Sequence, residues 1–300
     1  MAAPALAPTR PVLSSRARSK EYSIGSLVFL CLLWLSLLVG FATLVTLIAT
    51  TLTDGMSRLD SRLFLDYPSS RPAEAGARPA VIGSLWVIAA TALLAIPLGV
   101  AAAVHLEEFA DRNNWFNRFI ELNIQNLSAI PSILYGMLAL GTLSLLGVAN
   151  KNIVIGGALA LALLILPVVI IVTRESLRAV PRELRHGSLA LGATPLQTTW
   201  RVTLPAAVPG IATGTILALS RALGEAAPLL LLGALVFISF DPNGLLSGFT
   251  TLPIQIYGWI NQPQAEFHEL ASATAILLVG ILIAMNAVAI VIRNKFQRRW

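Results

Sequence analysis

Arg221 and Glu225 are the two residues of this 300-residue chain whose types and spacing best suit ion chemistry. Both lie inside a long apolar run, and a separation of four residues predicts that they share one face of a helix. A charged side chain near the centre of a bilayer costs about 2.5–3.5 kcal/mol, so we expect the pair to face protein or water rather than lipid. The guanidinium of Arg221 offers a planar fork of donors, which suits an oxyanion and suits a neutral sugar poorly.

Glu225 has three candidate roles beside an oxyanion. It can orient Arg221, balance its charge between transport events, and accept a hydrogen bond from a protonated phosphate oxygen. The last role favours phosphate over sulfate, because sulfate carries no proton near neutral pH. The alternative is a salt bridge that only holds helices together. Since intramembrane charges are costly and often mark a transport path, we favour the functional interpretation.

The composition indicates a membrane protein. The chain is 56% hydrophobic and 12% charged with a mean hydropathy of +0.77, whereas soluble domains are roughly 25% charged. Several uncharged apolar runs exceed the ~20 residues that a helix needs to cross ~30 Å of hydrocarbon, which excludes a soluble protein. The net charge of +6 does not indicate a nucleic-acid partner, because the basic residues lie between the apolar runs, as in cytoplasmic loops.

The predicted fold class is an all-α integral membrane protein with six transmembrane helices. The spans cover 24–53, 80–104, 119–148, 153–173, 206–238 and 270–292. Of the Lys and Arg residues, 15 lie on one side of this layout and five on the other, which places both termini in the cytoplasm.

The predicted domain boundaries follow from these spans. A basic cytoplasmic N-terminus, 1–23, precedes a first helix that is retained as a signal anchor. An external loop, 54–79, looks flexible. The five-helix membrane domain, 80–292, contains a cytoplasmic loop at 174–205 and an external loop at 239–269. We expect the aromatic residues Tyr257 and Trp259 of the external loop at the membrane interface, and the alternative is that this loop receives an external partner. The basic tail, 293–300, is cytoplasmic.

Cysteine and histidine predict no metal site. Cys31 is the single cysteine, so neither a disulfide within the chain nor a cysteine-based metal site is available. The three histidines lie in separate loops without metal-binding spacing, which also argues against a membrane enzyme. They are His105, His186 and His268.

The cytoplasmic loop predicts two short helices joined at a rigid elbow. Gly192 fits the residue just past a helix end, where a positive φ costs it little. Thr194-Pro195 fits a helix N-cap followed by proline at the first helical position. Leu204-Pro205 closes the loop before the fifth span.

This loop resembles the permease loop of ABC importers, in which a Glu-Ala-Ala triplet is followed by Gly and then by Leu-Pro and Pro-Gly. Here the triplet position reads His186-Gly187-Ser188, so His186 replaces the expected acid, and Glu183, one turn earlier, is the candidate to substitute for it. In that family the loop is a coupling helix that rests on a separate ATPase subunit. The residues that the resemblance assigns to ATPase coupling are Glu183, His186, Gly187, Ser188, Gly192, Leu204 and Pro205.

Other segments resemble phosphate-specific ABC permeases of the PstA type over about residues 80–300. They are Ile130-Pro131-Ser132-Ile133-Leu134-Tyr135-Gly136, Arg221-Ala222-Leu223-Gly224-Glu225-Ala226-Ala227-Pro228, Leu252-Pro253-Ile254-Gln255-Ile256-Tyr257, Phe267-His268, Met285-Asn286-Ala287 and Arg293-Asn294. The resemblance implies a type I importer permease with Arg221 and Glu225 on the substrate path. Ser132, Tyr135 and Asn126 are weaker path candidates, because polar groups in spans often bond helix to helix.

The resemblance also implies the partners. These are a sister permease of the PstC type, two copies of an ABC ATPase and an external phosphate-binding protein, in the bacterial inner membrane. No Gly-x-x-x-x-Gly-Lys-Ser/Thr sequence occurs in the chain, so we expect it to bind no cofactor and to leave ATP and Mg²⁺ to the partner ATPase.

Two alternatives remain open. One is an ABC permease for another oxyanion, such as sulfate or molybdate. The other is a proton-coupled secondary transporter with Glu225 as the proton carrier. Secondary transporters usually contain internal repeats, and none is visible in the six spans.

Overall fold

The structure is a computed structural model of the chain and describes residues 24–111, 114–234 and 237–296. Within this part, every regular element is helical, and the β-type pairing is one isolated bridge between Ile153 and Gly248. The predicted N-terminus, 1–23, and the last four residues of the predicted tail lie outside the described residues. Five described helices are long and apolar enough to span a membrane. They cover Ile24–Arg58, Arg78–Phe109, Val154–Arg178, Pro195–Leu223 and Ala265–Lys295.

The chain divides into two compact units, 1–49 and 50–300. The described part of the first unit is a stretch of helix α1 (Ile24–Gly55), which is apolar on every side over the predicted span 24–53. A helix that is apolar all round is typical of a membrane span.

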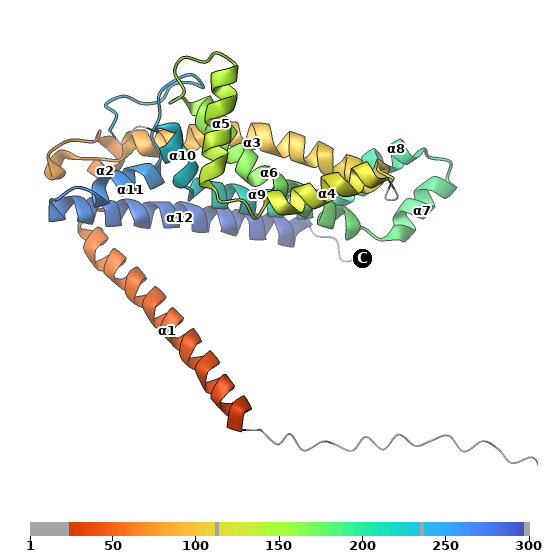
Figure 1. Ribbon diagram of the computed structural model, residues 1–300, viewed down its shortest axis with the longest axis horizontal. Helices are drawn as coiled ribbons and strands as arrows, with labels where there is room; N and C mark the ends of the chain where they lie inside the picture. The colour runs from red at the N-terminus through yellow and green to blue at the C-terminus, as the bar shows by residue number, and fades with distance from the viewer. Residues whose placement is uncertain (1–23, 112–113, 235–236, 297–300) are drawn as a thin grey trace, which may run out of the picture. The chain divides into compact units, whose positions relative to one another are not determined.

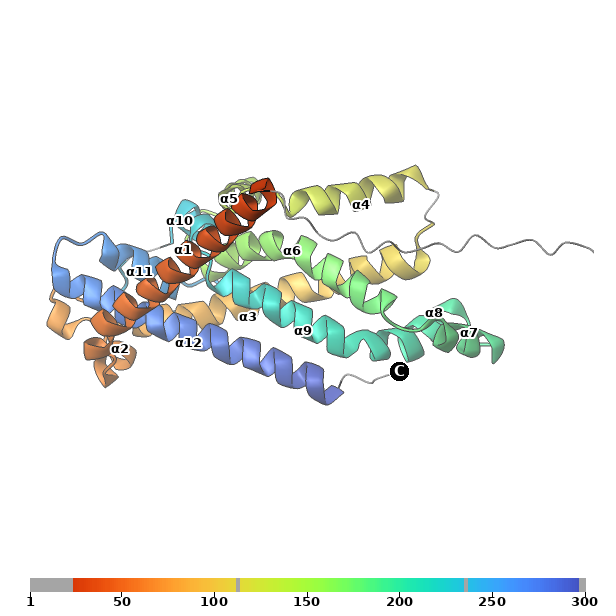
Figure 2. The ribbon, with the colours of Figure 1, turned by 90° about the horizontal axis from the view of Figure 1, so that it is seen from below.

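Four long helices of the second unit lie side by side (Figures 1 and 2). They are α3 (Arg78–Val104), α6 (Val154–Arg178), α9 (Leu204–Leu223) and α12 (Ala265–Phe296). Helices α3 and α6 run in the same direction, because Thr91 bonds to the Ala158 carbonyl and Gly99 lies against Val169 further along both helices.

Helix α9 runs opposite to α6, and small residues allow the two backbones to approach closely. A Cβ on Gly210 would lie 2.7 Å from Ser176 Oγ, and one on Gly214 would collide with Val172. Small residues at such contacts are typical of helix packing in membranes.

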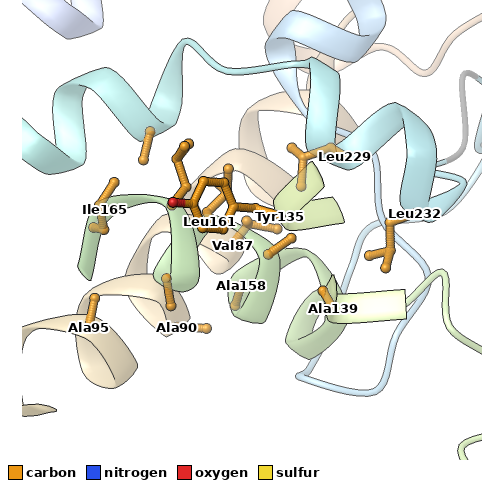
Figure 3. Close-up of a cluster of buried hydrophobic side chains, with 14 of the residues drawn as sticks. Val87, Ala90, Ala95, Tyr135, Ala139, Ala158, Leu161, Ile165, Leu229 and Leu232 are labelled. Carbon is orange, nitrogen blue, oxygen red and sulfur yellow. The ribbon is translucent and has the colours of Figure 1, made fainter. Parts of the chain in front are cut away.

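Tyr135 lies at the centre of the main apolar core (Figure 3). Its ring is 3% exposed and packs in one cluster with Val87 of α3, Leu161 of α6 and Leu229, which follows α9. The core therefore connects the parallel helices α3 and α6 with two further segments. One contains Tyr135 and lies between α3 and α6 in the sequence, and the other contains Leu229 and follows α9.

The prediction of one continuous helix over 119–148 is wrong. The segment folds as α4 (Trp115–Leu127) and α5 (Ile133–Leu145). Helix α4 runs antiparallel to α6, since Glu121 meets Arg174 and Ile124 packs with Ile170, whereas α5 crosses the bundle (Figure 1). Because α3 and α6 run in the same direction, the chain must cross back between them. We therefore expect α4 and α5 to make this crossing together.

The predicted span 206–238 is also interrupted. Helix α9 ends at Leu223, and the short α10 (Ala227–Leu232) follows. Pro228 explains the break, because its ring clashes with the carbonyl four residues earlier, at Gly224, and cannot donate a hydrogen bond to it. The α10 helix ends at Gly233, which has φ of +89°.

The two external segments are more ordered than the sequence indicated. The segment 54–79 contains short helical turns, including α2 (Ser61–Leu65), and Leu63 is fully buried. The segment 239–269 contains α11 (Leu252–Ile260). Trp259 is 4% exposed in the core, so its expected interfacial position is wrong, whereas Tyr257 is 50% exposed.

Candidate functional site

Two interrupted helices bring the path candidates together. Ser132, at the start of α5, donates a hydrogen bond of 2.9 Å to Glu225 Oε1, in the gap between α9 and α10. Next to this contact, a Cβ on Gly136 would collide with the carbonyl of Pro228, so the two segments touch. Both segments were singled out in the sequence, and only the fold makes them neighbours.

Arg221 lies on the last turn of α9 and is exposed in the isolated chain. Its side chain forms no hydrogen bond or ion pair with any residue that the structure describes. The expected single helix carrying both Arg221 and Glu225 is interrupted, because α9 ends at Leu223, and no ion pair joins the two described side chains. The guanidinium is therefore free to bind an anion.

The helix gap after α9 lies within the depth of the bundle. Ala222 and Leu223 line the same small cavity as Ser84 and Val87 of α3. These α3 residues lie six and nine positions after Arg78, the first residue of the helix, which corresponds to about 9–14 Å of helix.

Irregular backbone at this depth cannot face lipid, because its amide groups would lack hydrogen-bond partners. The residues between α4 and α5, 128–132, and those between α9 and α10, 224–226, are nevertheless exposed or partly exposed in the isolated chain. This face must therefore meet another protein or a water-filled path.

The side chains of the two remaining path candidates form no hydrogen bond with Arg221, Glu225 or Ser132. The hydroxyl of the buried Tyr135 donates to the carbonyl of Leu127, the last residue of α4. That carbonyl lies four residues before Pro131, which has no N–H to donate to it, and it also accepts from the backbone N–H of Ile130 at 3.2 Å. Asn126 is exposed on α4, and its side chain bonds to none of the described residues. The structure gives Tyr135 a packing contact and gives Asn126 no contact with the site.

The cytoplasmic elbow forms largely as its sequence predicts. Helix α7 (Arg182–Ala190) ends before Gly192, which has φ of +85°. Thr194 caps α8 (Pro195–Thr198) through a capping box with Gln197. Helix α9 begins at Leu204-Pro205, where the loop was expected to end, and a π-helical segment over Thr199–Thr203 joins α8 to it, so the helical run continues from Pro195 to Leu223.

The elbow presents an apolar surface at one end of the bundle (Figures 1 and 2). Ser188 Oγ and Thr198 Oγ1, 2.9 Å apart, tie α7 to α8. His186, Gly187 and Glu183 are exposed, and neither ionisable side chain pairs with a described residue. The large apolar side chains left exposed here are Leu189, Leu191, Leu196 and Trp200.

Sequence reasoning missed an ion network beside the elbow. Glu107, whose side chain is 2% exposed, lies 3.3 Å from Arg174 and 2.9 Å from Arg178. Arg174 also lies 2.8 Å from Glu121 of α4. The sequence contained a signal for this network, since Glu107 and Glu108 follow α3 directly and Arg174 and Arg178 lie four residues apart near the end of α6. The signal could be used only once α3 and α6 were known to run in the same direction, which places their ends together.

A second contact connects this network to the elbow. Arg185 of α7 lies 3.0 Å from Glu108, the neighbour of Glu107, and donates a hydrogen bond of 2.6 Å to the Leu177 carbonyl of α6. Helix α7, the first helix of the elbow, is therefore attached to the bundle by these side-chain contacts as well as by its backbone connection to α6.

Comparison with known proteins decides the family. The family model described as binding-protein-dependent transport system inner membrane component matches residues 95–300. The chain belongs to this family. This permease is 34% identical over 257 residues to the probable ABC transporter permease protein YqgI of Bacillus subtilis, covering 81% of this chain and 86% of the relative. It is 32% identical over 262 residues to the phosphate transport system permease protein PstA of Haemophilus influenzae, covering 86% and 90%.

Solved structures show the same fold. A chain of the bacterial alginate ABC transporter matches with a TM-score of 0.66 and 15% identity, covering 91% of this permease and 96% of that chain. A chain of the inward-facing MetNI methionine ABC transporter matches with a TM-score of 0.56 and 21% identity, covering 77% and 100%. The fold is that of a type I ABC importer permease.

The family defines the role of the chain. It is a multi-pass permease of the bacterial inner membrane and the transport subunit of an ABC importer. ATP hydrolysis belongs to a partner subunit. A partner permease, an ATPase and a substrate-binding protein complete such an importer.

Proposed function

We propose that this permease imports inorganic phosphate, and that Arg221, Glu225 and Ser132 line its path. The observation that carries the proposal is the unpaired guanidinium of Arg221, four residues before Glu225, whose carboxylate accepts a hydrogen bond from Ser132. Support also comes from relatives named as phosphate transport system permeases, including those of Haemophilus influenzae and Yersinia pestis.

The three side chains divide the recognition of a phosphate ion. Arg221 donates to the unprotonated oxygens through its fork of N–H groups. Glu225 keeps one carboxylate oxygen on Ser132 and offers the other to the phosphate hydroxyl. A sulfate ion has no hydroxyl at neutral pH, so it would bring an oxygen against the carboxylate and be repelled. Tyr135 and Asn126 remain weaker candidates for the path.

The proposal includes the partners of the phosphate importer. They are a sister permease of the PstC type across the exposed face that carries the helix gaps, two ATPase copies that use ATP and Mg²⁺, and an external phosphate-binding protein. The permease itself binds no cofactor. The ATPase docks on the elbow, where Glu183, His186, Gly187, Ser188 and Gly192 lie on α7 and its turn, while Leu204 and Pro205 connect the elbow to α9.

The test is uptake by the reconstituted four-component importer in liposomes. Wild type is expected to accumulate phosphate and not sulfate when ATP is supplied, and Arg221→Gln is expected to abolish uptake while the complex still assembles. The matched control is Arg71→Gln, which alters an exposed arginine in the external segment and should leave uptake unchanged.

Three results would contradict the proposal. Uptake that survives Arg221→Gln would remove this residue from the path. Accumulation of sulfate or molybdate in place of phosphate would assign the permease to another oxyanion. Uptake that requires a proton gradient instead of ATP would contradict the mechanism.

A further inference from the structure

A cavity of about 350 Å³ opens at the elbow end of the bundle, where α6 and α12 end and α9 begins (Figure 2). Its volume falls within the range of roughly 300–1,000 Å³ typical of ligand sites. Val172, Ala207 and Pro209 belong to its apolar walls, and Glu175 and Arg293 are the charged residues of the described lining. The cavity therefore combines apolar walls with one charge of each sign.

Both charges lie at the depth expected for lipid headgroups. The predicted spans end at residue 173 in α6 and at residue 292 in α12, so Glu175 and Arg293 follow them by two residues and by one. With a rise of 1.5 Å per residue, they lie about 1.5–3 Å beyond the hydrocarbon, on the predicted cytoplasmic side.

Apolar surface lies next to the cavity on the side of the hydrocarbon. Ile290, one turn before Arg293 on α12, is about half exposed in the isolated chain. Val208, between the lining residues Ala207 and Pro209 of α9, is also about half exposed. Acyl chains can therefore lie against the helices whose ends form the cavity.

Neither charge has a partner within the part of the chain that the structure describes. Glu175 and Arg293 form no ion pair or side-chain hydrogen bond there, and they do not pair with each other although they line one cavity. Arg178, close to Glu175 on α6, lies 2.9 Å from Glu107 instead. A ligand that carries both an anion and a cation would complement both side chains.

We propose that this cavity binds the headgroup of a phosphatidylethanolamine molecule from the cytoplasmic leaflet. Arg293 donates to the lipid phosphate, and Glu175 accepts a hydrogen bond from the primary ammonium. The trimethylammonium of phosphatidylcholine has no N–H to donate, and phosphatidylglycerol brings no cation to Glu175. Free inorganic phosphate would satisfy Arg293 alone. The proposal concerns a lipid site and does not depend on the solute that the permease imports.

The test is native mass spectrometry of the purified full importer, titrated with each of these three lipids. Wild type is expected to bind phosphatidylethanolamine about fivefold more tightly than the other two, as for one partly exposed charge pair. Glu175→Gln is expected to remove this preference and to leave phosphatidylglycerol binding no weaker. Arg293→Gln is expected to weaken the binding of all three lipids, because each carries a phosphate.

Glu266→Gln is the matched control, since it alters an exposed acidic residue at the other end of α12 and should bind lipid like wild type. The proposal is wrong if wild type shows no preference among the lipids, or if Glu175→Gln keeps the preference. It is also wrong if a partner subunit covers the cavity, so that the assembled importer retains no lipid there. Displacement of the lipid by inorganic phosphate would assign Arg293 to a free anion. Because lipid binding is measured without transport, a failure of the phosphate assignment in uptake assays is read separately.

Discussion

Single side chains set the chemistry of the proposed path. Arg221 has no partner within the described chain, and Glu225 has Ser132, so the charges are kept apart rather than joined in an ion pair. An ion pair between them would have to break each time an anion binds. Their separation leaves the guanidinium ready for the anion and fixes the carboxylate by a neutral hydroxyl.

Ser132→Ala tests this positioning. Loss of a hydrogen bond to a charged group costs about 1.5–3 kcal/mol, so the variant is expected to lose roughly tenfold or more of its phosphate-over-sulfate preference. The measurement is phosphate uptake in liposomes with sulfate as competitor. Ser144→Ala is the control, because Ser144 bonds only along its own helix, to the Leu140 carbonyl. An unchanged preference in Ser132→Ala would show that the hydroxyl does not position Glu225.

The helices show why the site has irregular backbone. Pro131 stands four residues after Leu127, the last residue of α4, and Pro228 stands five after Leu223, the last residue of α9. Both interruptions occur where Ser132 and Glu225 meet. Pro97, Pro167 and Pro209 lie inside continuous helices of the same chain. Proline therefore permits a break here, and neighbouring packing decides whether the break forms.

The ion network between α3, α4 and α6 predicts a strong effect of Glu107→Gln. The substitution leaves the buried Arg174 without one of its carboxylates, and loss of one partner from a buried pair costs about 3–5 kcal/mol. Glu74→Gln is the control, because its pair with Arg71 is exposed and contributes at most about 1 kcal/mol. The measurement is the free energy of unfolding in mixed micelles. Equal values for the two variants would show that the network does not stabilise the fold.

The topology of the complete chain predicts that Trp115 and Asn150 lie on opposite sides of the membrane. Only α4 and α5 separate these residues, so the prediction tests whether the broken segment crosses. In a Cys31→Ser background, an impermeant maleimide added outside is expected to label Asn150→Cys and not Trp115→Cys. Labelling of both variants from outside would place α4 and α5 on one side of the membrane.

Local patterns predicted those parts of the structure that depend on neighbouring residues. The cap at Thr194 and the positive φ at Gly192 follow from short-range sterics and hydrogen bonds, so the sequence was sufficient for both. The order in the segment 54–79 was missed, because the cluster that buries Leu63 includes Leu252 and Leu270, which are distant in sequence. The position of Trp259 was missed for the same reason.

The sequence by itself determined the membrane location and the elbow, and its loop charges predict the orientation, since hydrocarbon burial and loop charge are properties of each segment alone. Tertiary structure decided which residues form the site. It ended α9 before Glu225, brought Ser132 to that carboxylate from 93 positions away, and joined Glu107, which follows α3, to Arg174 of α6. These contacts depend on how helices pack against one another. The spacing of residues along one segment does not predict that packing.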